Sequence, residues 1–170
     1  MGKLTVLGIC LITSIAFCHP AVAEQTTIKK QLVGAWTLVA VTAERPDGSK
    51  AEAFGTGPKG IIIFTDSGHF SLFQSRADLP KLAENDRGKA TAEEAMAVVR
   101  GSIAYYGTYS VNETDKSLSV TLNGATFANL LGGAQKRNIT SLTDDELRFS
   151  NPRTPSGMTL QTVWQRAKAR

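Results

Sequence analysis

Alternation of apolar and polar residues predicts that most of this chain forms β-strands. The pattern is clearest where Leu118, Val120 and Leu122 are separated by hydroxyl-bearing side chains. A period of two is typical of a strand with one face in a core and the other in water. Such one-sided strands favour antiparallel pairing.

Short turn sequences divide the chain into about eight strands. Asp66-Ser67-Gly68 joins two of them as a tight hairpin, and Arg45-Pro46-Asp47-Gly48 ends the first. Eight strands joined by short turns predict an all-β fold, an eight-stranded antiparallel up-and-down barrel of the size that holds one small ligand. The expected strands are 32–41, 60–65, 69–74, 104–111, 118–123, 134–142, 147–150 and 158–166, with one helical turn at 26–32 and a loop at 51–59.

One segment has the periodicity of a helix instead. Thr91 and Glu94 have the spacing of a capping box, and apolar residues follow at intervals of three or four. We expect one amphipathic helix, inserted between the third and fourth strands and seated on the barrel, with a movable lid as the alternative. The apolar positions are Ala92, Ala95, Met96, Val99 and Ile103.

The first residues have the pattern of a secretory signal peptide. Lys3 precedes an apolar run over 4–17, and a small-x-small cleavage pattern ends at Ala23. We therefore expect a signal peptide at 1–23, one compact β-barrel domain at 24–170, and a periplasmic or secreted location. A lipidated Cys18 is the alternative, but bulky Phe17 disfavours it. The run is short for a membrane span, and no later stretch is long enough, so no transmembrane helix is expected.

Charge and cysteine content exclude several function classes. The formal net charge is +4, and the basic residues are scattered rather than clustered, which disfavours nucleic-acid binding. Cys10 and Cys18 both lie in the signal segment, so the mature domain depends on apolar burial rather than on disulfides. His69 is the one histidine outside that segment, which excludes a zinc site of several imidazoles. No metal or other cofactor is expected, and the oligomeric state stays open.

Several residues are candidates for contact with a ligand. An indole at Trp36 can close one barrel end, and Tyr105 and Tyr109 share a strand face that can line a cavity. Arg76 forms either a solvated pair with Asp78 or a site that steers an acidic ligand head. No catalytic residue is assigned. The candidate ligand-contacting residues are Trp36, His69, Phe73, Arg76, Tyr105, Tyr109, Phe127, Asn129, Arg137 and Trp164.

The order and spacing of five motifs resemble the lipocalin-like domain family. They are Gly34-Ala35-Trp36, Arg45-Pro46-Asp47-Gly48, Pro58-Lys59-Gly60-Ile61-Ile62-Ile63-Phe64, Gly68-His69-Phe70-Ser71 and Thr162-Val163-Trp164-Gln165-Arg166. The resemblance implies a calycin-type barrel with an interior cavity, in which Trp36 packs under an arginine, either Arg166 or Arg148. Lipocalins carry their helix after the barrel, so the inserted helix departs from their pattern.

Three interpretations of function remain open. The first is a protein that binds a small hydrophobic or amphipathic ligand in the barrel. The second is a barrel enzyme of isomerase or cyclase type that uses Tyr105, Arg76 or His69, and it predicts polar groups deep in the cavity. The third is a protein-interaction module, which predicts an apolar patch outside the barrel.

Overall fold

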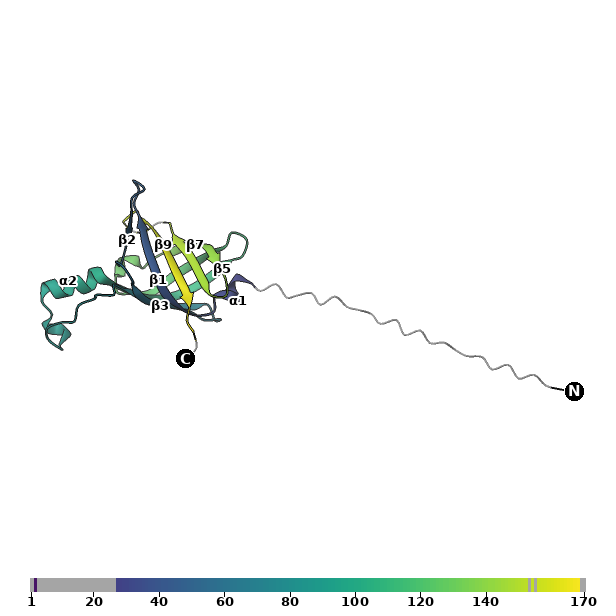
Figure 1. Cartoon of the computed structure of the whole chain (residues 1–170), viewed down its shortest axis with the longest axis horizontal. Helices are drawn as coiled ribbons and strands as arrows, with labels where there is room; N and C mark the ends of the chain where they lie inside the picture. The colour runs from purple at the N-terminus through teal and green to yellow at the C-terminus, as the bar shows by residue number, and fades with distance from the viewer. Residues whose placement is uncertain (1, 3–26, 153, 155, 169–170) are drawn as a thin grey trace.

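One antiparallel sheet closes on itself to form the body of the molecule (Figure 1). The computed structural model describes residue 2 and residues 27–168 except 153 and 155, so the expected signal peptide lies outside the described residues apart from Gly2. The strands are β1 (Gly34–Glu44), β2 (Lys50–Glu52), β3 (Lys59–Phe64), β4 (His69–Ser75), β5 (Ser102–Asn112), β6 (Ser117–Ala125), β7 (Ala134–Leu142), β8 (Glu146–Asn151) and β9 (Thr159–Arg166). The helices are α1 (Ile28–Leu32) and α2 (Ala92–Gly101), with short 3₁₀ turns η1 (Arg87–Lys89) and η2 (Ala128–Leu130).

The barrel is closed by β1, which pairs with β3 on one side and with β9 on the other. From β3 to β9 each strand pairs with its successor, so β1 and β3–β9 form the eight-stranded antiparallel barrel that the sequence predicts. β2 is a short addition that pairs with the end of β1. The prediction of a loop over 51–59 is therefore partly wrong, because β2 occupies its first residues. All three β2 side chains are exposed, so the apolar alternation that identifies a strand is missing there.

One end of the barrel is filled by aromatic and aliphatic side chains. The ring of Phe64 lies edge-on to Tyr109 at 5.1 Å between centroids, and Phe149 stacks on Trp164 at 6.3 Å. Trp36 and Trp164 are fully buried. A void beside Phe64 and Phe149 has a volume of about 10 Å³ and is too small to be a ligand site. This end of the barrel is therefore a packed core rather than part of a ligand cavity.

Trp36 closes this end together with an arginine from β9. The Trp36 Nε1 donates to the Leu32 carbonyl at 2.9 Å, and the Arg166 guanidinium carbon lies 4.0 Å from the indole centroid. Of the two arginines that the resemblance allowed over Trp36, Arg166 is therefore the one that packs there. Arg148 pairs with Glu146 instead. The contact is favourable as a cation–π interaction and covers the indole from water.

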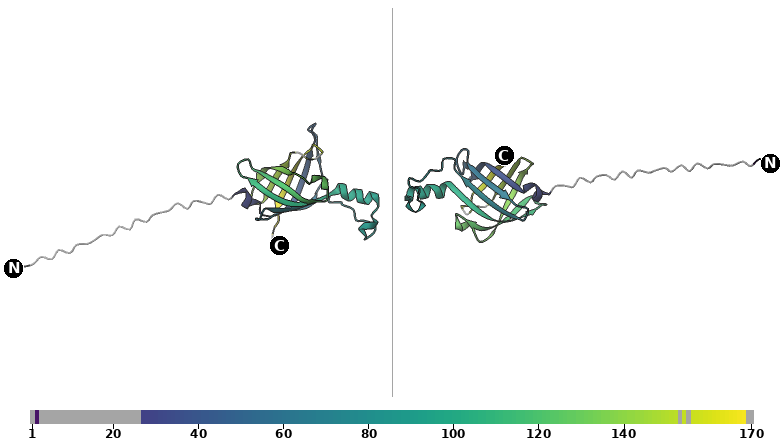
Figure 2. Two further views of the ribbon diagram at one scale, coloured as in Figure 1. Left: turned by 180° about the vertical axis from the view of Figure 1, so that it is seen from behind. Right: turned by 90° about the horizontal axis from the view of Figure 1, so that it is seen from below.

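α2 projects away from the barrel between β4 and β5 (Figures 1 and 2). The capping box of Thr91 and Glu94 is formed. Met96 and Val99, expected to seat the helix, are 46% and 70% exposed, and Ile103 belongs to β5. The seating prediction is therefore wrong. Helical spacing identifies an apolar face, but it does not identify what that face contacts.

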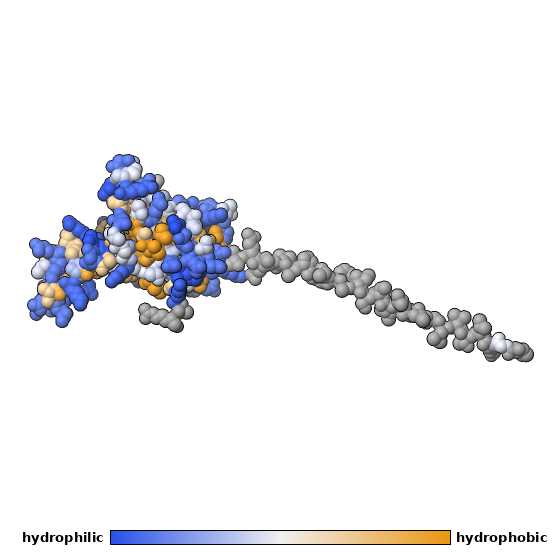
Figure 3. All heavy atoms as spheres, in the orientation of Figure 1, coloured by the Kyte–Doolittle hydropathy of each residue, from blue (hydrophilic) through white to orange (hydrophobic). Residues whose placement is uncertain are grey.

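The outer wall of β1, β3, β4 and β5 carries an apolar patch. Ile61 lies opposite Phe73 in the sheet register, and Ser71 lies between Ile63 and Tyr106. Apolar side chains gather near the middle of the barrel in Figure 3. We call this surface the outer-wall patch; its exposed members are Val39, Ile61, Ile63, Phe73 and Tyr106.

No helix among the described residues is long and apolar enough to cross a membrane.

Candidate functional site

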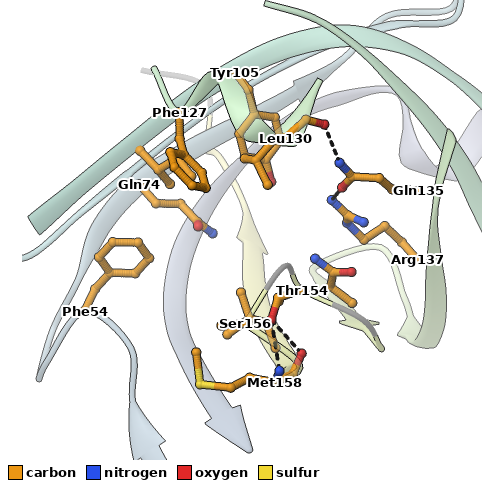
Figure 4. Close-up of a pocket in the computed structure, with 13 residues that line it drawn as sticks. Phe54, Gln74, Tyr105, Phe127, Leu130, Gln135, Arg137, Thr154, Ser156 and Met158 are labelled. Carbon is orange, nitrogen blue, oxygen red and sulfur yellow. Dashed lines mark hydrogen bonds between the residues drawn. The ribbon is translucent and has the colours of Figure 1, made fainter. Parts of the chain in front are cut away.

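A cavity of about 440 Å³ lies at the other, open end of the barrel (Figure 4). This volume is within the range of pockets that hold one small molecule. Strand ends form its wall, and residues from three connecting segments, among them Phe54, Phe127 and Met158, line its mouth. The described lining residues are Phe54, Gln74, Ile103, Tyr105, Phe127, Leu130, Gln135, Arg137, Asn151, Thr154, Ser156, Met158 and Leu160.

Strand periodicity directs the wall residues inward. Ile103 and Tyr105 are two positions apart on β5, and Gln135 and Arg137 are two apart on β7. Sheet register places Arg137 opposite Leu118, which is fully buried. Residues on one strand face share a side of the sheet, so these four side chains reach the interior together.

Tyr105 and Arg137 form the floor of the cavity. Both residues line the cavity and also the small void beneath it. The Tyr105 ring lies edge-on to Phe70 at 6.1 Å, which connects the floor to the packed aromatic core below. A ligand entering from the open end therefore reaches these two side chains last.

Arg137 is a buried cation without an anionic partner among the residues that the structure describes. Only 5% of the residue is exposed, yet within the described part of the chain no Asp or Glu oxygen lies within 4.0 Å of its guanidinium. Its Nη2 donates to Gln135 Oε1 at 2.8 Å, and its Nη1 makes a long bond of 3.4 Å to the Lys136 carbonyl. Gln135 in turn donates to the Leu130 carbonyl at 2.9 Å. Both acceptors of the guanidinium among the described residues are therefore neutral.

Gln74 is a second polar residue at the cavity, and its side chain has no hydrogen-bond partner within the described part of the chain. It is 5% exposed, and its carboxamide makes no hydrogen bond to any other described residue. The side chain comes from β4 and points into the cavity (Figure 4). The carboxamide faces the cavity, so Gln74 offers a donor and an acceptor to a ligand or water.

Of the ten residues predicted to contact a ligand, Tyr105, Phe127 and Arg137 line this cavity. Trp36 and Trp164 lie in the packed closed end, where the Trp164 Nε1 has no hydrogen-bond partner among the residues that the structure describes.

Tyr109 lies in the same closed end. Its hydroxyl donates to the Thr65 carbonyl at 2.8 Å. Burial raises the pKa of the Tyr109 phenol, and the Asp66 carboxylate raises it further. These placements separate Trp36, Trp164 and Tyr109 from the cavity.

The remaining four candidates lie outside the cavity. His69 and Phe73 are exposed on the outer face of β4, with the His69 Nδ1 3.1 Å from the Ser67 hydroxyl. Arg76 makes two bonds of 2.8 Å to Asp78, and these lower the pKa of that carboxyl. Asn129 is exposed on η2. Strand direction explains the β4 residues, because the even-numbered positions there face inward and the odd-numbered ones mostly outward.

The sequence interpretation missed residues of two kinds. Gln74 shares a strand face with Phe70 and Leu72, so strict alternation could have identified it as inward-facing. Phe54 and Met158 reach the cavity from loops, and alternation carries no information about loop residues.

The chemistry of the described lining is limited to hydrogen bonds, apolar contact and one positive charge. None of these residues is an Asp, Glu, His, Cys or Lys. Over the described residues, no group of three or more His, Cys, Asp or Glu side chains could hold a metal ion. The cavity offers electrostatic stabilisation by Arg137, and the phenol of Tyr105 is the acid–base group among its described side chains.

The family model of the lipocalin-like domain matches residues 33–167. Similar solved structures include bovine odorant-binding protein in complex with a selenium-containing odorant, with 17% identity, a TM-score of 0.42, and coverage of 87% of this chain and 76% of that chain. A redesigned β-barrel bound to DFHBI has 19% identity, a TM-score of 0.41, and coverage of 83% and 100% respectively. No curated protein matches the chain.

Proposed function

Because the chain belongs to the lipocalin-like domain family, we propose that it binds one small hydrophobic or amphipathic molecule at the open end of its barrel. The observation that carries the proposal is the cavity of about 440 Å³, which has an apolar wall and a few inward polar groups. This combination is typical of small-molecule sites, where apolar contact supplies affinity and polar groups fix orientation.

A substitution that fills the cavity tests the proposal. We expect Ile103→Trp to weaken binding of the neutral fluorescent probe N-phenyl-1-naphthylamine by about tenfold or more, because the added ring occupies the probe's volume; tenfold corresponds to about 1.4 kcal/mol. The matched control is Ile61→Trp, which makes the same change on the outer-wall patch and should bind like the wild type. A fluorescence titration decides the question. Equal affinities for wild type and Ile103→Trp would place the probe elsewhere.

We also propose that the protein is exported and that residues 1–23 are removed. The support is the basic residue Lys3, the apolar run and the small-x-small pattern that ends at Ala23. Intact mass analysis of the protein recovered outside the cytoplasm should give a chain that begins at Glu24. A chain that retains Met1, or a lipid on Cys18, would contradict the proposal. Native mass spectrometry of the same sample would show whether a small molecule is co-purified.

The other two interpretations have weaker support. The enzyme interpretation predicts polar groups deep in the cavity, and Tyr105 and Arg137 lie there, but Arg76 and His69 lie outside it. The interaction interpretation predicts an apolar patch outside the barrel, which the outer-wall patch provides. That patch has no feature that selects a partner, whereas the cavity has a buried charge. Ligand binding is therefore the function that the site supports best.

A further inference from the structure

We propose that the natural ligand of this cavity is an organic acid, with an anionic carboxylate bound to Arg137 and an apolar tail directed to the open end. The inference rests on the proposed function, since it specifies which class of small molecule the cavity takes. It starts from the charge at the floor, which the fold buries without neutralising.

Burial of Arg137 is unfavourable when no described side chain supplies a counter-charge. Removal of a guanidinium from water is costly unless an anion or a full set of hydrogen bonds replaces the water. The guanidinium has five N–H donors, and two bonds to neutral acceptors are formed, one of them at 3.4 Å. The remaining donors are available to a ligand.

The surroundings of Arg137 favour an anion over a neutral group. The described lining contains no carboxylate that would repel one. A carboxylate can accept two parallel N–H bonds from a guanidinium, and such charge-assisted pairs are about twice as strong as neutral hydrogen bonds. Gln135 Oε1 accepts a bond from one of these N–H groups. The ligand carboxylate would either replace this neutral acceptor or bind the remaining N–H groups beside it. The free carboxamide of Gln74 adds a further donor at the cavity.

The position of Arg137 sets the orientation of the ligand. Arg137 lies at the floor, and the apolar residues Phe127, Leu130 and Met158 come from the loops around the mouth (Figure 4). A carboxylate at the floor therefore leaves an apolar tail against apolar side chains. The opposite orientation would place the anion near the mouth and the tail against the guanidinium, which leaves the charge uncompensated.

A competition experiment tests the inference on the wild-type protein. Decanoate and 1-decanol have the same chain length, and each is used at neutral pH to displace bound N-phenyl-1-naphthylamine. We expect decanoate to compete about 10- to 100-fold better than 1-decanol, because a hydrogen bond to a charged group is stronger than one to a hydroxyl. Equal competition, or failure of decanoate to displace the bound probe, would overturn the inference alone. Absence of probe binding would overturn the proposed function, and this inference with it.

Variants at and beside Arg137 assign the preference to this residue. Arg137→Met has similar volume without charge and should reduce the preference for decanoate to less than about threefold, with 1-decanol affinity retained. Arg137→Lys should keep part of the preference. The matched control is Lys136→Met, because Lys136 is also a cation of β7 but is exposed and paired with Asp115 at 2.8 Å. An unchanged preference in Arg137→Met would overturn the assignment.

A second measurement does not depend on the folding of any variant. Decanoate labelled with ¹³C at its carboxyl group can be titrated by NMR while bound to the wild-type protein. A nearby guanidinium favours the anion, so the pKa of the bound acid should lie below that of the free acid. Burial without a cation would raise the pKa instead. A raised or unchanged pKa would therefore overturn the inference.

Discussion

Replacement of Trp36 by alanine is expected to lower the free energy of unfolding by roughly 3–5 kcal/mol. Trp36 is fully buried at the closed end, and its Nε1 satisfies the Leu32 carbonyl. Alanine would leave a cavity at the barrel base, remove that donor, and uncover the face on which Arg166 lies at 4.0 Å. These losses act together because they involve one side chain that contacts α1, β1 and β9.

Urea unfolding followed by far-UV circular dichroism measures this effect. Trp36→Phe retains an aromatic ring but loses the donor, so we expect a smaller loss of about 1–3 kcal/mol. The control is Val39→Ala on the same strand, where the side chain is 48% exposed, with an expected change within about 0.5 kcal/mol. If Trp36→Ala destabilised the protein no more than Val39→Ala, the closed end would not be a packed core.

Gly107→Ala is expected to cost roughly 3 kcal/mol, although it adds a single methyl group. A Cβ at Gly107 would lie 1.9 Å from the Thr121 carbonyl oxygen and 3.0 Å from the Leu122 Cα. Both are backbone atoms of β6, so relief of the overlap requires movement of a strand rather than rotation of a side chain. The sheet register also shifts here, because Tyr106 pairs with Gly124 and Gly107 pairs with Leu122.

Gly133→Ala provides the matched control for this substitution. Nothing lies within 4 Å of a Cβ at Gly133, so the same change there should alter the free energy of unfolding by less than about 0.5 kcal/mol. Thermal and urea unfolding of both variants test the difference. Equal stabilities would show that β5 and β6 can separate at Gly107 without cost.

The barrel could be predicted from the sequence because its strands carry their own signals. Leu118, Val120 and Leu122 alternate with polar residues, and each lies in the core. The position of α2 relative to the barrel could not be predicted in this way. Met96 and Val99 have the spacing of a buried face, but spacing is a local property and the partner of a helix is not.

The site was less accessible to sequence analysis than the fold. Arg137 was a candidate, but its strand is polar on both sides of it, so alternation does not show which face is inside. The inward direction follows from its register with Leu118, a pairing between residues far apart in the chain. The absence of a counter-charge near Arg137, within the described residues, depends on the packing of several strands and is not encoded in any local pattern.

The most direct test of ligand binding inside the barrel is an NMR titration of the ¹⁵N-labelled protein with decanoate. We predict that the largest amide shift changes occur at the cavity residues, among them Ile103, Tyr105 and Arg137. Largest changes at Ile61 and Phe73 of the outer-wall patch, with the cavity residues unaffected, would contradict a ligand site at the open end of the barrel.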